Sequence, residues 1–385
     1  MIDGDDKKLL LLVDDDSENI RVVHSILKDK YKIRVATDGA KALELAKADP
    51  LPDLILLDVM MPQMDGYEAC GCLKADQRTR DIPVIFLTGK TEVADETRGF
   101  EVGAVDYIHK PFSPPIVTAR VRNHLMLREA HETVARQLLA INGELEMARQ
   151  IQLSILPRET PHLPGLTIEA RYIPMSSLAG DFYDFLVIDE QHVGVLIADV
   201  SGHGLPSALI ASMLQTALAA QAPHASDPAE VLLGLNKALC GKFRSHYVTA
   251  AYLFVDMEKG TVTYGGAAHP PILHWRSKSK DIAECVQNGL MLGPFRDSAY
   301  SAITLALEEQ DRVVLITDGI TEATDSSGNE FGMARLRQIV DLNHALPANR
   351  FADKLLDELS HWSEDAIGAR QSDDVTLLAI DFKRQ

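Results

Sequence analysis

Acidic and hydroxyl side chains follow several short apolar segments in the first part of the chain. Asp14 and Asp15 follow Leu9–Val13, Asp58 follows Leu54–Leu57, Thr88 follows Val84–Leu87, and Lys110 comes shortly after Ala104–Ile108. If these segments are parallel strands, their carboxyl ends bring all five side chains to one edge of a sheet. Three carboxylates that close favour a bound Mg²⁺. One of them is then a nucleophile toward a phosphoryl donor, with Lys110 and Thr88 stabilising the transferred oxygens.

The C-terminal half carries a second, dispersed set of carboxylates. They are Asp181 in Gly-Asp-Phe-Tyr-Asp, Asp199 in Ala-Asp-Val-Ser-Gly-His-Gly, Asp318 in Thr-Asp-Gly-Ile-Thr-Glu, and Asp373 in Ser-Asp-Asp-Val-Thr. Oxygen ligands without a His/Cys framework favour Mg²⁺ or Mn²⁺ over zinc. Two such ions can clamp a phosphoryl group and activate a water for attack. A single Asp-Gly pair is more simply an ordinary turn, but four acidic motifs together favour a metal site.

The elements that must position the first set alternate between strand and helix. Helical apolar spacing covers Ser17–Lys28 and Ala40–Ala48, and a further short strand is predicted at Ile33–Ala36. Near-continuous apolar strands separated by helices are typical of a parallel sheet covered on both faces. The first 125 or so residues are therefore predicted to form an α/β domain.

From Pro115 to Leu156 the sequence is helical and keeps a heptad spacing. The seam consists of Leu127, His131, Val134, Leu138, Ile141, Leu145, Ala148, Gln152 and Ile155. Such a seam favours a parallel two-stranded coiled coil, although two of its positions are polar. A single amphipathic helix lying on a domain core stays open as the alternative. Pro157, Pro161 and Pro164 end the helix.

The remainder of the chain mixes strands with helices and is predicted to be an α+β layered domain. Strands, mostly antiparallel, are expected at Val193–Ala198, Thr249–Val255, Thr261–Tyr264, Pro271–His274, Arg312–Ile316 and Val375–Asp381. Helices are expected at Ser207–Ala220, Pro228–Cys240, Met333–Leu342 and Asn349–Trp362.

Composition excludes several classes of function. The 385 residues carry 56 Asp+Glu against 38 Lys+Arg, a net charge of −18, which disfavours nucleic acid and anionic membranes as partners. No secretory signal or membrane span is expected, and Leu205–Ala222 is interpreted as a buried helix. The four cysteines form no disulfide framework, so a cytoplasmic protein with reduced thiols is predicted.

The N-terminal motifs resemble the receiver domain of bacterial response regulators. The matching stretches are Leu-Leu-Val-Asp-Asp-Asp (11–16), the segment 53–66 that ends in Met-Asp-Gly, Val-Ile-Phe-Leu-Thr-Gly (84–89) and Asp-Tyr-Ile-His-Lys-Pro-Phe (106–112). The resemblance implies a doubly wound, five-stranded parallel sheet. It makes Asp58 the phospho-acceptor, Asp14, Asp15, Asp58 and the main-chain oxygen of Met60 the Mg²⁺ site, Thr88 and Tyr107 the switch residues, and Lys110 the phosphate-binding residue. The implied donor is a phosphohistidine on a partner histidine kinase.

The C-terminal motifs resemble the PPM (type 2C) serine/threonine phosphatases, most closely the bacterial branch that controls sigma factors and stress responses. Glu146–Pro157, Gly265–Leu273 and Glu330–Gly332 add to the likeness. It implies a β-sandwich flanked by helices that binds two Mn²⁺ or Mg²⁺ ions. The implied ligands are Asp181, Asp199, Asp318, Asp373 and the main-chain oxygen of Val200, with Asp374 and His203 as supporting polar residues. Ala179 stands where a glycine is usual, and Arg171 is a weak candidate for the catalytic arginine of larger members.

These expectations combine into a receiver domain (1–127), a coiled-coil linker (128–160) and a phosphatase domain (161–385). Phosphorylation of Asp58 is expected to control the phosphatase domain, which removes phosphate from a phosphoserine or phosphothreonine protein. Activation is the favoured direction of this control. The resemblance implies an anti-sigma-factor antagonist as substrate. The heptad seam predicts a homodimer through the coiled coil, and the few residues after the Asp373 motif leave no room for a kinase-like domain, so the opposing kinase is expected to be a separate protein. The alternative is a catalytically weak or inactive, phosphatase-like adaptor that binds a partner under receiver control. A diguanylate cyclase, suggested by Leu178–Tyr183, leaves the other three acidic motifs unexplained.

Overall fold

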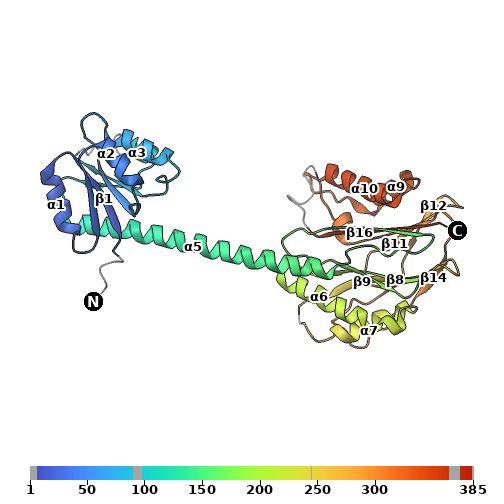
Figure 1. The fold of residues 1–385 in the computed structure, drawn as a ribbon. Helices are drawn as coiled ribbons and strands as arrows, with labels where there is room; N and C mark the ends of the chain where they lie inside the picture. Colours follow the sequence, from blue (N-terminus) through green and yellow to red (C-terminus); the bar gives the residue numbers. More distant parts are fainter. Residues whose placement is uncertain (1–6, 90–97, 244, 364–372, 384–385) are drawn as a thin grey trace. The chain divides into compact units, whose positions relative to one another are not determined.

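The computed structural model describes residues 7–89, 98–243, 245–363 and 373–383. The chain divides into two compact units, residues 1–141 and 142–385. The first unit holds one parallel sheet, and the second holds two sheets whose pairings are nearly all antiparallel (Figure 1). None of the helices in the described ranges is long and apolar enough to cross a membrane.

The first unit is built on a five-stranded sheet in the order β2-β1-β3-β4-β5, with every pairing parallel. Its strands are β1 (Leu9–Val13), β2 (Lys32–Ala36), β3 (Leu54–Asp58), β4 (Val84–Thr88) and β5 (Asp106–His109). The central strands are buried along their whole length, as their continuous apolar sequences require. The predicted α/β receiver fold is therefore confirmed.

Helices cover both faces of this sheet (Figure 1). They are α1 (Ser17–Leu27), α2 (Gly39–Lys47), α3 (Gly66–Ala75) and α5 (Pro114–Ile155). Residues of α1 and the start of α5 share one core cluster, and α2 and α3 share the other. Asp16 caps α1 by accepting a hydrogen bond from the backbone N–H of Glu18. Because Asp16 is the cap, the two carboxylates before it are not needed for that role.

Helix α5 has 42 residues and contributes to both units. In the first unit Val117, Val121 and Leu125 are buried, and in the second Ile155 packs against the core. Between these ends, the seam residues Leu127, Val134, Leu138 and Ile141 are more than half exposed. The predicted seam thus has an apolar face open to solvent along its first half. Its later position Gln152 is instead buried inside the second unit.

The second unit contains two sheets. One runs β13-β10-β9-β8-β7, with β14 paired to β10, and the other runs β12-β11-β15-β16-β6. The strands of the first are β7 (Phe182–Val187), β8 (His192–Val200), β9 (Val248–Asp256), β10 (Thr261–Ala267), β13 (Asn288–Gly289) and β14 (Ile303–Ala306). Those of the second are β6 (Leu166–Ile173), β11 (Ile272–Arg276), β12 (Asp281–Cys285), β15 (Arg312–Ile316) and β16 (Val375–Phe382).

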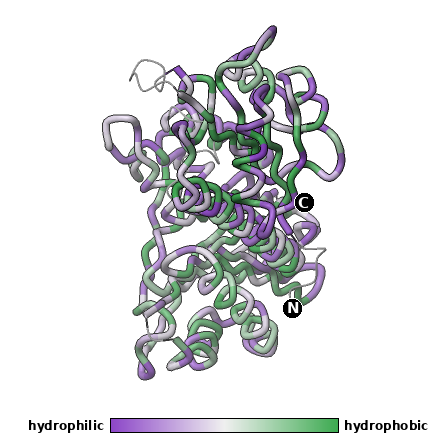
Figure 2. Tube along the Cα trace, turned by 90° about the vertical axis from the view of Figure 1, so that its left-hand side faces the viewer, coloured by the Kyte–Doolittle hydropathy of each residue, from purple (hydrophilic) through white to green (hydrophobic). Residues whose placement is uncertain are grey.

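The side chains of β15 show how the layers are stacked. Val313 and Leu315 join the core shared with the other sheet, whereas Val314 and Ile316 pack with helices on the outer face. Those helices are α9 (Gly332–Leu342) and α10 (Ala348–Trp362), while α6 (Leu205–Ala219) and α7 (Pro228–Leu239) cover the other sheet (Figure 1). Figure 2 colours the Cα trace by hydropathy, from purple for hydrophilic stretches to green for hydrophobic ones. The predicted α+β sandwich flanked by helices is confirmed.

Several strands of this unit are not evident in the sequence. β6 reads Leu-Thr-Ile-Glu-Ala-Arg-Tyr-Ile, and most of its residues are only half buried, so its apolar pattern is weak. β7, β12, β13 and β14 were also not predicted; β12 and β14 are short strands with little fully buried surface. Helix α6 matches the prediction in position, but Leu205 and Leu209 on it are exposed.

Candidate functional site

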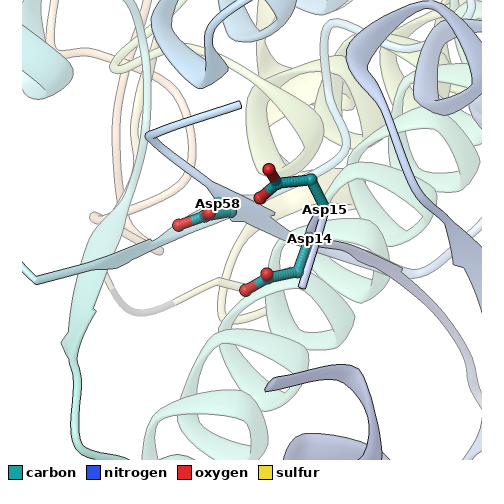
Figure 3. Close-up of side chains that lie close together, drawn as sticks. All are labelled: Asp14, Asp15 and Asp58. Atoms are coloured by element: carbon teal, nitrogen blue, oxygen red, sulfur yellow. The ribbon is translucent and has the colours of Figure 1, made fainter. Parts of the chain in front are cut away.

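Three carboxylates meet at the edge of the parallel sheet. Asp14 and Asp15 follow β1, Asp58 ends β3, and one oxygen of each lies within 4.8 Å of the others (Figure 3). Asp14 and Asp58 are buried, whereas Asp15 is exposed. Among the described residues this is the one group of three or more His, Cys, Asp or Glu side chains that comes so close together. Its oxygen-only composition fits a hard cation such as Mg²⁺.

Lys110 provides the positive charge of this group. Its Nζ donates to Asp14 Oδ2 and to Asp58 Oδ1, each at 2.9 Å. Burial raises the pKa of the Asp58 carboxyl, and the hydrogen bond from Lys110 opposes that effect. Burial would lower the pKa of Lys110, but its two carboxylate partners hold that pKa above the ordinary value. Lys110 therefore stays charged beside the carboxylate that would accept a phosphoryl group.

The remaining receiver residues predicted from the sequence lie on strands of the same sheet or directly after them. Thr88 ends β4 and is buried, and the main chain of Met60 follows β3. Tyr107 on β5 is also buried, with ring centroids 5.5 Å from Phe86 and 5.3 Å from Phe100. The Tyr107 hydroxyl occupies the space beside Gly99, where a Cβ would lie 1.6 Å from its oxygen. The Tyr107 ring can therefore occupy this position only because residue 99 has no side chain.

The four C-terminal carboxylates are held by both sheets of the second unit. Asp181 precedes β7 and Asp199 lies near the end of β8, and the pairing of Phe182 with Ala198 sets them side by side. Asp318 starts the short helix α8 (Asp318–Thr321) directly after β15, and Asp373 precedes β16, which pairs with β15. The metal carboxylates implied by the sequence thus come from the same end of neighbouring strands.

Electrostatics show that these carboxylates act on one another. Burial first, then the charges of Asp318, Asp373, Asp374 and Glu322, raise the pKa of Asp199 to about 8. Burial, Asp373 and Glu322 raise the pKa of Asp318 to about 6. The pKa of the fully buried Asp181 also lies well above its ordinary value, because of burial and the charge of Asp199. A cluster of carboxylates whose charges repel in this way fits bound cations.

The chemistry of the cluster bears on which cations it fits. Within the described residues, no three of these carboxylates bring ligand atoms to within 4.8 Å of one another, unlike the receiver group. The donors are carboxylate oxygens without a His/Cys framework, which fits Mg²⁺ or Mn²⁺.

Two threonines that sequence reasoning missed orient Asp181. Thr317 and Thr376 both donate their hydroxyl hydrogens to Asp181 Oδ2, at 2.7 and 2.6 Å. Thr317 Oγ1 also accepts the backbone N–H of Thr376 at 2.9 Å, which locks the pair. Two hydroxyls thus hold one oxygen of the Asp181 carboxylate in place. The sequence signal was present, since each threonine stands within three residues of a predicted ligand.

Asp374 fixes the loop that leads to Asp181. Its Oδ1 accepts the backbone N–H of Met175 at 2.8 Å, and its Oδ2 accepts that of Gly180 at 2.6 Å. The neighbouring Gly319 lets α8 approach this point, because a Cβ there would lie 1.9 Å from the main-chain oxygen of Asp374. A carboxylate that accepts backbone N–H groups from a loop limits the conformations of that loop. The predicted supporting role of Asp374 has this geometric basis.

Gln152 is a second residue that holds this loop. Its side-chain amide exchanges two hydrogen bonds with the backbone of Ala179, where the sequence departs from the usual glycine. Sequence reasoning placed Gln152 in the heptad seam, and its polarity at a seam position was the available signal. The other predicted residues are placed more simply. Val200 is the buried last residue of β8, His203 is exposed, and Arg171 is paired with Glu169 and Asp353.

Comparison with known proteins identifies both units. Residues 189–383, just over half of the chain, match the family described as Stage II sporulation protein E (SpoIIE). The chain belongs to the SpoIIE family. Residues 10–122 match the response regulator receiver domain. The protein therefore joins a receiver domain to a domain of the SpoIIE family.

Individual relatives cover different parts of this SpoIIE-family chain. A Vibrio cholerae protein named "Probable cyclic di-GMP phosphodiesterase" is 42% identical over 144 residues, 36% of this chain and 32% of that protein. "Phosphoserine phosphatase RsbU" of Bacillus subtilis is 28% identical over 256 residues, 66% of this chain and 75% of that protein. The chain thus spans about a third of the first relative's length.

A solved structure is similar in fold to the second unit. It is the SiaA-PP2C domain of Pseudomonas aeruginosa, with a TM-score of 0.57 and 22% sequence identity. The match covers 65% of this chain and 100% of that one.

Proposed function

We propose that the protein is a metal-dependent phosphatase that hydrolyses phosphoserine or phosphothreonine in another protein under the control of its receiver domain. The observation that carries the proposal is the mutual repulsion of Asp199, Asp318 and Asp373, which come from separate motifs and meet at one end of the sandwich. Membership of the SpoIIE family and similarity to a protein named phosphoserine phosphatase support it.

Asp181, Asp199, Asp318, Asp373 and the main-chain oxygen of Val200 would hold two Mn²⁺ or Mg²⁺ ions. When bound, such a pair supplies a nucleophilic water at neutral pH and charge for the phosphoryl oxygens. The protein's own contribution is orientation. Thr317 and Thr376 fix the Asp181 carboxylate, and Asp374 fixes the loop before it. The substrate that the SpoIIE resemblance favours is a phosphorylated anti-sigma-factor antagonist.

The activity is tested with the full-length protein, Mn²⁺ and a phosphoserine protein or an aryl phosphate. The wild type is expected to release phosphate. Asp199→Asn is expected to lose at least 100-fold in rate, because the substitution removes a carboxylate that would bind both ions. Asp189→Asn is the matched control, since Asp189 is an exposed carboxylate of the same domain, hydrogen-bonded to His192. No turnover by the wild type would favour the adaptor alternative. Phosphoproteins that accumulate in cells carrying Asp199→Asn would identify the substrate.

The receiver would accept a phosphoryl group on Asp58 from a histidine kinase. Asp15, Asp58 and the Met60 main-chain oxygen would bind one Mg²⁺ directly, with Asp14 acting through water, while Lys110 and Thr88 stabilise the acyl phosphate. Acetyl phosphate with Mg²⁺ is expected to label the wild type and the exposed-site control Asp29→Asn, but not Asp58→Asn. The same labelling is expected to raise the phosphatase rate of the wild type. Equal labelling of Asp58→Asn would remove the assignment of Asp58.

The exposed apolar face of α5 would pair two copies of the chain in a parallel coiled coil. Its seam residues Leu127, Val134, Leu138 and Ile141 are 52–56% exposed in the single chain. In a parallel pair, Glu144 at one flank of the seam faces Arg149 of the second copy, an attractive pairing. Leu138→Glu is expected to give monomers in light scattering, whereas the exposed neighbour Gln137→Glu keeps the dimer. A wild type that is monomeric at micromolar concentration would exclude the coiled coil.

A further inference from the structure

His269 is a buried histidine whose backbone and side chain are both hydrogen-bonded to neighbouring strands. It follows β10, is 2% exposed, and comes directly after Ala268, whose φ of 53° is unusual for a residue with a side chain. Asn288 holds its backbone from both directions, since Nδ2 donates to the His269 carbonyl at 2.9 Å and Oδ1 accepts its N–H at 3.3 Å. Local strain together with such clamping is a feature of positions where function constrains the backbone.

The side chain of His269 connects to the strand that carries Asp199. Its Nδ1 lies 3.0 Å from Thr249 Oγ1, and Thr249 is the residue of β9 paired with Asp199 of β8. His269 is therefore connected, through the hydroxyl of Thr249, to the residue whose backbone pairs with Asp199. A change in the position of the ring would therefore shift Thr249 and, with it, the end of β8 that carries Asp199.

The other ring nitrogen of His269 is buried. Burial lowers the pKa of the ring to about 3, and the backbone of Ile316 opposes that lowering. Within the described part of the chain, His269 Nε2 makes no hydrogen bond of ordinary geometry, although the atom is buried. A buried N–H without a full partner costs about 1–3 kcal/mol in general, so its retention needs a reason.

We propose that His269 is a positioning residue for the metal pair, which holds Thr249 and, through it, the Asp199 end of β8. The neutral ring accepts the Thr249 hydroxyl hydrogen on Nδ1 and carries its own hydrogen on Nε2. Because Thr249 is the residue of β9 paired with Asp199, the imidazole acts on the strand end that carries this ligand. This inference rests on the proposed function, because it concerns the placement of a ligand of the metal pair.

The experiment measures Mn²⁺ binding to the full-length protein by titration calorimetry, together with the Mn²⁺ dependence of phosphate release. His269→Leu keeps the approximate volume but removes both nitrogens, and is expected to weaken Mn²⁺ binding about 10-fold, the usual size for a residue that supports metal ligands. The rate at saturating Mn²⁺ should recover to within a few-fold. His269→Gln, which keeps a donor and an acceptor, is expected to restore most of the affinity.

Two further variants separate this role from a merely structural one. His274→Gln is the matched control, because His274 is equally buried in the same domain but bonds to Asp311, and its Mn²⁺ affinity should equal that of the wild type. Thr249→Val tests the same connection without altering the histidine, so it remains informative if His269→Leu does not fold. The double variant Thr249→Val/His269→Leu should bind Mn²⁺ no more weakly than His269→Leu alone.

The results distinguish the inference from the proposed function. Wild-type affinity in both His269→Leu and Thr249→Val, with only a lower melting temperature, would overturn the role of His269 and leave the phosphatase intact. A wild type that binds no Mn²⁺ would contradict the proposed function and the role of His269 together.

Discussion

The side chain of Gln152 and the backbone of Ala179 are joined by two hydrogen bonds across 27 residues of sequence. Gln152 Nε2 donates to the Ala179 carbonyl at 2.7 Å, and the Ala179 N–H donates to Oε1 at 3.1 Å. Gln152 lies in the last part of α5, and Ala179 stands two residues before Asp181. The helix that begins in the receiver is therefore bonded directly to the loop that positions a predicted metal ligand.

Replacing Gln152 tests whether this pair transmits the receiver signal. Gln152→Ala is expected to abolish most of the rate change caused by acetyl phosphate, because the loop no longer follows α5. The variant should also lose about 1–3 kcal/mol of stability in the phosphatase domain, since the backbone groups of Ala179 lose their buried partners. Phosphatase rates with and without acetyl phosphate, and denaturant unfolding, measure both effects.

Gln150→Ala is the control for this change. Gln150 has the same side chain on the same helix but is exposed, so its loss should leave both measurements at wild-type values. An unchanged response to acetyl phosphate in Gln152→Ala would show that the signal reaches the phosphatase by another route.

Tyr107, the predicted switch residue of the receiver, packs against Gly99. A Cβ at residue 99 would lie 1.6 Å from the Tyr107 hydroxyl oxygen, so Gly99→Ala must displace the ring from its contacts with Phe86 and Phe100. We expect a destabilisation of about 1–3 kcal/mol, as is usual for overpacking, and an altered effect of Asp58 phosphorylation on the phosphatase. Thermal unfolding and tyrosine fluorescence report the displacement.

Gly71→Ala is the matched control, for which stability is expected to rise rather than fall. Gly71 lies inside α3, and a Cβ added there would have no atom within 4 Å, so alanine should stabilise the helix by about 0.5–1 kcal/mol. Equal stability of Gly99→Ala and the wild type would mean that Tyr107 does not occupy this position in solution.

The strands that could be predicted from the sequence are those buried along nearly their whole length. β1, β3, β4 and β15 are unbroken apolar segments, and their ends located the acidic residues that the structure gathers. β6 was missed because its residues alternate irregularly and are mostly half buried. Gln152, Thr317 and Thr376 act through contacts with residues far away in sequence, so their partners cannot be inferred from local pattern. Gln152 was instead placed in a seam because heptad spacing does not distinguish a coiled coil from a helix that packs on a domain.

The two hydroxyls that donate to Asp181 Oδ2 lead to a metal-binding prediction. Thr376→Val is nearly isosteric and removes one donor at 2.6 Å, which frees the carboxylate to rotate and leaves burial to raise its pKa further. We expect Mn²⁺ affinity to fall about 10-fold to 100-fold, as for other residues that support metal ligands. Thr263→Val is the control, because Thr263 pairs with Thr304 at an exposed site on β10. Equal Mn²⁺ affinity in Thr376→Val and the wild type would contradict the role of Thr376 in orienting Asp181 for metal binding.

The buried imidazole of His269 makes the phosphatase domain sensitive to acid. Burial lowers its pKa from the ordinary 6.5 to about 3, so the folded protein holds the ring neutral while the unfolded chain is protonated below pH 6.5. Its contribution to stability is therefore complete above pH 6.5 and is lost as the pH falls from there toward 3. At pH 5 the loss amounts to about 2 kcal/mol relative to pH 7.5. Denaturant unfolding of the wild type and His269→Leu at both pH values measures this difference. The leucine variant should lose less stability than the wild type, by about that amount. An identical loss in both proteins would mean that His269 is protonated, or accessible to water, in the folded state.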